Sequence, residues 1–261
     1  MATERELQLL RAAASAGITD RTELANFMAQ VGHESGGLGR LEESFRYTRS
    51  AEQVASVVRS AMRNGRPTLE AARLEALEGR PEALAELMYG GRMGNDRIGD
   101  GYRYRGRGYI QLTGRQTYRA AGEALGIDLE RNPQLATEPG TAARIAVWYW
   151  QTRVRAEDRG DVRAAGAAIN GRDPPNGLAD RERRFEQWNR VLLERGHELL
   201  SDVGQRPTTA IPVLPPADPG EPAHPPGTLL RRRDARDVAG AARCQSAPDQ
   251  RLRPALAQWP A

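Results

Sequence analysis

Proline is concentrated in one stretch of the chain, where eight of the twenty residues from 207 to 226 are proline. Because proline fixes φ and lacks an N–H, such a stretch is neither helix nor central strand and is typical of an extended linker. Residues 229–261, which follow it, are rich in Arg and Ala and have too few apolar residues for a core. The sequence therefore predicts one folded domain over residues 1–203, a proline-rich linker over 204–228 and a disordered tail over 229–261.

The predicted domain shows the apolar spacing of helices and almost no strand alternation. Leu24, Phe27, Met28 and Val31 form one stripe of a helix over residues 22–34. No apolar run approaches the roughly 18 residues that a membrane span needs. The pattern predicts a mainly α domain. Further helices are expected over residues 50–58, 81–88, 116–125, 140–152 and 178–200, with a short strand or extended segment over 109–113.

Charge and cysteine content exclude several kinds of protein. All 38 basic residues are arginine, and residues 1–205 hold 30 of them against 29 acidic residues. The predicted domain is therefore not a basic nucleic-acid-binding body. Residues 102–109 mix Arg, Tyr and Gly as RNA-binding segments do, but they lie inside this charge-balanced region, which argues against nucleic acid. One cysteine and three histidines favour neither a disulfide framework nor a metal site, and no cofactor is implied.

One carboxyl group falls on the apolar stripe of the first of these helices. At 100° per residue, Glu34 lies about 20° from Phe27 and about 60° from Val31. Charged side chains seldom occupy such a face without a partner or a function, and Ser35-Gly36-Gly37 follows directly, which leaves room for a ligand. Glu34 is thus a candidate general acid. The alternative is a helix-end carboxylate that points to water or pairs with an arginine, and spacing alone favours that alternative.

A second acidic pair, Glu42-Glu43, follows within nine residues. Inverting glycoside hydrolysis uses two carboxyl groups about 6.5–9.5 Å apart, one as acid and one as the base that activates water. A helix end, a turn and a second acid could supply this separation. Taken alone, however, such a pair is more often part of a solvated face.

Three sequence blocks carry a resemblance to glycoside hydrolase family 19, which contains chitinases and lysozyme-like phage endolysins. The first is FMAQVGHESGG at 27–37, the second is YRYRGRGYIQLTG at 102–114, and the third joins AING at 168–171 to NGLADR at 176–181. They occur in the family's order and span residues 20–195. The resemblance implies a lysozyme-like single catalytic domain with a bilobal cleft and at most a small sheet.

The resemblance also implies a catalytic apparatus. Glu34 matches the general acid, and Glu43 matches the general base of the short-loop bacterial and phage members, with Glu42 the less favoured choice. Thr113 matches the hydroxyl residue that helps to hold the attacking water. Together they imply hydrolysis by single displacement with inversion, without a metal or organic cofactor.

Further residues match the family's substrate contacts. Gln111 and Asn170 match residues that bond substrate sugars or their N-acetyl groups, and Arg181 matches an arginine near the acidic pair. Tyr109 is a candidate for stacking on a sugar face or for packing the loop, and both interpretations stay open. The sequence departs from the family at Thr117 and Arg172, where many relatives have Asn and Gly, and both positions fall where the substrate should lie.

The substrate implied is a polysaccharide, and two candidates fit. We expect an endo-acting muramidase of phage or prophage type that cleaves β-1,4 bonds of peptidoglycan; a chitinase is the second choice and a delivered toxic effector a third. The charged start MATERE favours synthesis in the cytoplasm without a signal peptide, with release to the cell wall through a holin-type pore. A monomer is expected. The tail segment LLRRR at 229–233 suits weak contact with anionic lipid, although a solvated tail is preferred.

Overall fold

The computed structural model describes residues 2–201, which are mainly helical, as expected for this fold class. Their only β structure is two isolated bridges, Glu42 with Arg107 and Arg107 with Leu112. None of the helices in this range is long and apolar enough to cross a membrane. The predicted linker and tail lie outside the described residues, so the predicted domain boundaries stay predictions.

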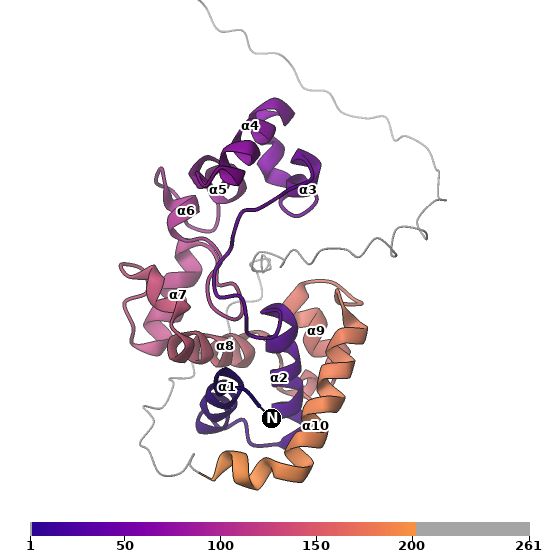
Figure 1. Cartoon of the computed structure of the whole chain (residues 1–261). Coiled ribbons are helices and arrows are strands. Elements are labelled where there is room, and N and C mark those ends of the chain that lie inside the picture. Colours follow the sequence, from indigo (N-terminus) through magenta and orange to yellow (C-terminus); the bar gives the residue numbers. More distant parts are fainter. Residues whose placement is uncertain (1, 202–261) are drawn as a thin grey trace, which may run out of the picture. The chain divides into compact units, whose positions relative to one another are not determined.

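The helices pack in two groups (Figure 1). The first group surrounds α2 and α8 and consists of α1 (Glu4–Ser15), α2 (Arg21–Glu34), α7 (Arg115–Leu125), η2 (Pro133–Thr137), α8 (Pro139–Arg153), η3 (Ala156–Asp158), α9 (Val162–Asn170) and α10 (Leu178–Leu200). The second group consists of α3 (Ala51–Ala55), η1 (Arg59–Asn64), α4 (Arg66–Leu77), α5 (Glu82–Tyr89) and α6 (Asp100–Arg103). The segment of residues 35–50 runs from the first group to the second (Figure 1).

Helix α2 lies in the core of the first group, because α1, α9 and α10 all pack against it. Its residues 24–33 are all buried, so it is apolar or hydrogen-bonded all round rather than striped on one side. Asp20 caps its start by accepting a hydrogen bond from the Glu23 N–H at 2.9 Å. Phe27 packs edge-on against Trp150 of α8, with ring centroids 5.7 Å apart.

The end of α2 is defined by Ser35 and two glycines. The Ser35 hydroxyl donates to the Val31 carbonyl at 2.7 Å and accepts from the Leu38 N–H at 2.8 Å. Gly36 and Gly37 then take positive φ values of 64° and 78°, a region that costs glycine little. The chain therefore turns away from the helix axis immediately after Glu34.

Most expected helices are present within two residues of their predicted bounds, and the structure differs from the prediction in three respects. The helix expected over 50–58 is only the short α3, Ala51–Ala55. Instead of the expected strand or extended segment over 109–113, residues 108–111 form a turn that the bridge between Arg107 and Leu112 closes. Gly108 and Gln111 have φ values of 73° and 53°, which a strand excludes. Helices α1, α4, α6 and α9 were not expected from the sequence.

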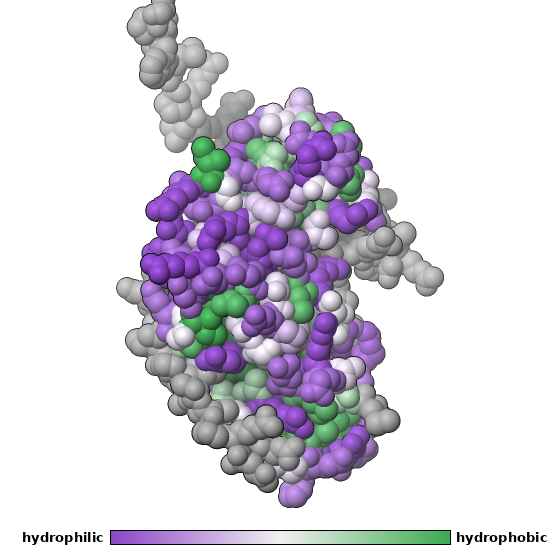
Figure 2. Space-filling view, turned by 60° about the vertical axis from the view of Figure 1, so that its left-hand side comes forward, coloured by the Kyte–Doolittle hydropathy of each residue, from purple (hydrophilic) through white to green (hydrophobic). Residues whose placement is uncertain are grey.

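The surface of the described residues is mostly polar. Figure 2 shows a predominantly hydrophilic face on which apolar residues form separate patches. Among the described residues, the exposed large hydrophobic side chains are those of Leu74, Ile98 and Leu193. Most large apolar side chains of the described residues are thus buried, either in the core around α2 and α8 or within the second helix group.

Candidate active site

Glu34 is the last residue of α2, and its side chain is 14% exposed. Its Oε1 accepts a hydrogen bond from Nη2 of Arg181, near the start of α10. Within residues 2–201 no hydrogen bond to its Oε2 is present. Glu34 therefore has a cationic partner on one oxygen and a second oxygen available to a ligand.

Arg181 is fully buried, with 0% exposure, and the structure accounts for its position. Its Nε donates to the Asn176 carbonyl at 3.0 Å, its Nη1 donates to Gln30 Oε1 and its Nη2 donates to Glu34. A buried guanidinium needs such partners, since an unpaired buried charge is very costly. Arg181 thus joins the first and third sequence blocks across 147 residues.

A second pair, His33 with Asp180, holds the same two helices together. His33 Nδ1 lies 2.7 Å from Asp180 Oδ2, and the histidine is buried. Burial raises the pKa of Asp180, but hydrogen bonds from Arg184 and His33 outweigh it and lower the pKa to about 2. His33 therefore has a structural hydrogen-bonding role at the helix end.

Glu43 is brought to the second sequence block by backbone pairing. The Glu43 N–H donates to the Gly106 carbonyl at 2.9 Å, and the Gly108 N–H donates to the Leu41 carbonyl at 2.9 Å. The side chain accepts from the Tyr89 hydroxyl at 2.8 Å on Oε1 and from the Gly106 N–H at 3.2 Å on Oε2.

The pKa of Glu43 is raised to about 7. Burial is the largest cause, and it exceeds the lowering by the Tyr89 and Gly106 hydrogen bonds and by the charge of Arg105. A carboxyl group that titrates near neutral pH is well matched to proton transfer. The neighbouring carboxylate differs, because Glu42 Oε1 accepts from Arg105 Nη2 at 2.6 Å and from Arg107 Nε at 2.9 Å. Glu42, the less favoured candidate for the general base, is therefore the counterion of two arginines.

Thr113 and Gln111 meet Glu43 beside the α-carbon of Gly106. A β-carbon built on Gly106 would lie 2.8 Å from Gln111 Oε1, 3.3 Å from Glu43 Oε2 and 3.4 Å from Thr113 Oγ1. Three oxygen atoms of three predicted site residues thus surround one small region that only glycine leaves open. The Thr113 hydroxyl donates to the Gln111 carbonyl at 2.8 Å, and Gln111 Nε2 donates to the Gly108 carbonyl at 3.1 Å.

Two predicted substrate contacts lie elsewhere. Tyr109 is fully buried, with 0% exposure, in the core cluster that includes α1; burial raises the pKa of its hydroxyl, and the charge of Arg5 partly opposes this. The interpretation of Tyr109 as a sugar-stacking residue is wrong, because its ring is covered by protein. Asn170, the last residue of α9, is partly buried, and its Oδ1 accepts from the Asn176 N–H at 3.0 Å. It shapes the loop before α10, and its contact with sugar stays a prediction.

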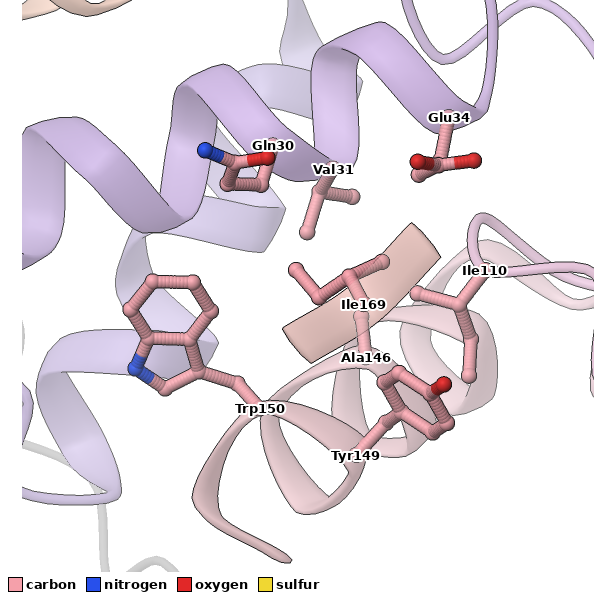
Figure 3. Close-up of a pocket in the computed structure, with 8 residues that line it drawn as sticks. All are labelled: Gln30, Val31, Glu34, Ile110, Ala146, Tyr149, Trp150 and Ile169. Atoms are coloured by element: carbon pink, nitrogen blue, oxygen red, sulfur yellow. The ribbon is translucent and has the colours of Figure 1, made fainter. Parts of the chain in front are cut away.

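Two further residues of the site were not found from the sequence. Tyr89, at the end of α5, lies 46 residues from the carboxylate that it bonds, so no local pattern could have indicated it. Gln30 lies one helical turn before Glu34, a spacing that places both on one side of α2. Figure 3 shows Gln30, Val31 and Glu34 along α2, facing a small, largely apolar notch formed with Ile110, Ala146, Tyr149, Trp150 and Ile169.

Among the described residues no group of three His, Cys, Asp or Glu could hold a metal ion.

Comparisons with known proteins agree with the resemblance. The family model described as "Chitinase class I" matches residues 86–178, a range that begins after Glu34 and Glu43. A glycosyl hydrolase family 19 domain-containing protein from Haemophilus influenzae is 35% identical over 158 residues, which are 60% of this chain and 74% of that protein. Chitinase 11 of Oryza sativa subsp. japonica is 52% identical over 50 residues, which are 19% of this chain and 20% of the chitinase. The chain thus spans only a fifth of the rice enzyme.

Solved structures give matches of the same kind. Chitinase C from Streptomyces griseus has 24% identity and a TM-score of 0.44, over 73% of this chain and 69% of that one. A class IV chitinase from Zea mays has 19% identity and a TM-score of 0.44, over 74% of this chain and 82% of that one. Because both TM-scores are below 0.5, the family assignment rests on the sequence matches. The long match with the Haemophilus influenzae protein shows that the chain belongs to glycoside hydrolase family 19, a family of glycosidases.

Proposed function

We propose that the protein hydrolyses β-1,4 bonds within bacterial peptidoglycan by single displacement with inversion. The observation that carries the proposal is the contrast between two carboxyl groups. Glu34 is bonded on one oxygen to a buried guanidinium, whereas Glu43 is partly buried beside a phenol and has a pKa of about 7. Two carboxyl groups in such different surroundings can take different proton-transfer roles, and the resemblance to family 19 assigns the acid role to Glu34 and the base role to Glu43.

In the proposed reaction, Glu34 loses one proton and Glu43 gains one. Glu34 gives a proton from Oε2 to the glycosidic oxygen as the bond from that oxygen to the anomeric carbon breaks. Water attacks the anomeric carbon from the opposite face and gives its proton to Glu43, while Thr113 and Gln111 hold that water. One carboxyl group loses a proton and the other gains one, and exchange with solvent restores the starting state.

The choice of peptidoglycan over chitin is supported by exposed arginines that lie close in the sequence to the site residues. Arg40 follows Glu34 in the turn after α2, Arg46 follows Glu43, and Arg172 follows Asn170; all three side chains are exposed. Chitin is neutral, whereas the lactyl-linked peptides of peptidoglycan carry carboxylates that such arginines attract. Since such a polymer lies outside the cytoplasmic membrane, the proposal includes release of the protein to the wall through a separate pore.

Chitin is the second candidate. It is favoured by the names of the plant relatives, such as chitinase 11 of rice at 52% identity over 50 residues. Chitin and peptidoglycan are both β-1,4 polymers of N-acetylated amino sugars, so the same acid, base and water would act on either.

A paired digestion tests the proposal. The protein is incubated with purified peptidoglycan and, separately, with soluble chitin oligomers, with Glu34→Gln as the control, and mass spectrometry identifies the new reducing ends. Peptidoglycan fragments that end in reducing N-acetylmuramic acid are expected, and their release should fall as salt screens the arginines. Cleavage of chitin alone would establish the second candidate, and cleavage of neither substrate would refute the proposed function.

A further inference from the structure

Gln30 is a buried polar residue that the reaction described above does not use. It lies on α2 one turn before Glu34, is 0% exposed, and lines the notch beside that carboxyl group (Figure 3). Amide side chains are seldom fully buried without a complete set of hydrogen bonds. The contacts of Gln30 therefore indicate what it does.

Its neighbours fix the orientation of the Gln30 amide. Nε2 donates to Asn26 Oδ1 at 3.0 Å and to the Val162 carbonyl at 2.9 Å, which uses both of its hydrogens. Asn26 cannot turn its own amide to compete, because its Nδ2 donates to the Arg159 carbonyl at 2.8 Å. Oε1 of Gln30 is thus held toward Arg181 as an acceptor, and the flipped amide would set donor against donor.

With Gln30 Oε1 as one acceptor, the three nitrogens of the Arg181 guanidinium bond to three different partners. Nε bonds the Asn176 carbonyl, Nη1 bonds Gln30 and Nη2 bonds Glu34 Oε1. Arginine and a carboxylate commonly form a two-point pair in which both carboxylate oxygens accept. Gln30 accepts from Nη1, one of the two nitrogens that such a pair would use, and only one oxygen of Glu34 is engaged.

We propose that Gln30 is a positioning residue that limits Arg181 to one hydrogen bond with Glu34 and so keeps Oε2 of Glu34 free to carry the catalytic proton. This inference rests on the proposed role of Glu34 as general acid. It assigns Gln30 a task in proton delivery without contact to substrate.

No other charged or titratable group described around Glu34 takes over the role of Gln30 in limiting Arg181 to one hydrogen bond. From α8, Tyr149 faces the same notch; burial raises its pKa, and the charge of Glu34 adds to this while Arg153 opposes it. From α10, Arg184 approaches Gly32, although its Nε bonds Asp180 at 2.9 Å. His33 is paired with Asp180. Within the described residues, the hydrogen bonds and ion pairs of Arg181 leave Gln30 as its only side-chain partner besides Glu34.

Gln30→Met tests the proposal, because methionine has a similar length but a very weak acceptor. A crystal structure of this variant should show both terminal nitrogens of Arg181 on Glu34, one on each oxygen. At pH 7, kcat should fall about tenfold or more with KM unchanged, and the pH above which kcat declines should move lower by about one to two units, as a second charged hydrogen bond would cause. Ile169→Val, in the same notch, is the control that should leave the hydrogen bond between Arg181 and Glu34, kcat and the pH dependence of kcat unchanged.

Arg181→Lys supplies the second variant, because a single ammonium nitrogen offers no planar two-point fork. In that background, Gln30→Met should change kcat less than twofold, which a merely structural role of Gln30 would not predict. An unchanged single hydrogen bond in the Gln30→Met crystal structure would overturn the inference, as would a two-point pair with unchanged kcat. Absence of hydrolysis by the parent protein would refute the proposed function, and the crystal structure would still decide the geometry.

Discussion

Removing one hydroxyl group beside Glu43 should change the pH dependence of the enzyme. Tyr89 donates to Glu43 Oε1 at 2.8 Å, and this hydrogen bond is the first of the influences that lower a pKa otherwise raised by burial. In Tyr89→Phe the ring remains and only the donor is lost. A hydrogen bond to a charged group contributes about 1.5–3 kcal/mol, and about 1.4 kcal/mol corresponds to one pKa unit. The pKa of Glu43 should therefore rise from about 7 to about 8 or 9.

The sign of the effect follows from the proposed role of Glu43. A general base acts when it is deprotonated, so kcat/KM declines below its pKa. A higher pKa moves this decline to higher pH, and activity at pH 6 should fall about tenfold for each unit by which the pKa rises. Well above the new pKa, the variant should approach the activity of the parent protein.

Initial rates of polymer cleavage across pH 4–10 would measure this shift. Tyr47→Phe is the matched control, because Tyr47 is buried near Glu43 but, among the described residues, gives it no hydrogen bond. The acidic limb should stay in place in Tyr47→Phe and move upward in Tyr89→Phe. Identical acidic limbs in the two variants would refute the reasoning about Glu43.

Three further predictions follow from the site. Glu34→Gln should abolish turnover while the far-ultraviolet circular dichroism stays unchanged, and full activity would remove Glu34 from the reaction. Gly106→Ala should lower kcat at least about tenfold, since its β-carbon would lie 2.8 Å from Gln111 Oε1, whereas Gly160→Ala, with nothing within 4 Å, should have no effect. The pKa of Asp180 is lowered to about 2 by Arg184 and His33 against the opposing effect of burial, so its stabilisation is present above pH 4 and is lost as the pH falls toward 2. Denaturant unfolding should show this loss in the parent protein and a smaller one in Asp180→Asn.

The features that the sequence predicted correctly are set by residues that lie close together in the chain. Apolar spacing placed α2 and α8 within one residue of their observed bounds, and the bounds of α10 agree. The position of Glu34 on a helix end followed from the same period, together with the glycines that stop the helix. Of the helices that were missed, α6 has only four residues, and four of the nine residues of α9 (Val162–Asn170) are alanine, a small side chain that gives a weak apolar signal.

The parts that could not be predicted depend on contacts between distant segments. Spacing alone favoured a solvated or arginine-paired Glu34, and the structure does pair it with an arginine, but only the fold could identify that arginine as the buried Arg181. The sequence left two interpretations of Tyr109 open, and only the fold excludes sugar stacking, because the turn directs the ring into the core. The bond between Tyr89 and Glu43 joins two groups that the sequence gives no reason to connect.

The anomeric form of the first product tests the two-carboxylate mechanism most directly. A β-1,4-linked oligomer of the cleaved polymer would be digested inside an NMR tube, and the anomeric proton signal would be followed before mutarotation. Inversion predicts that the α-anomer appears first and then decays toward the equilibrium mixture, and that Glu34→Gln and Glu43→Gln each suppress it. An initial β-anomer would mean retention through a covalent or substrate-assisted route, and would contradict the roles assigned to Glu34 and Glu43.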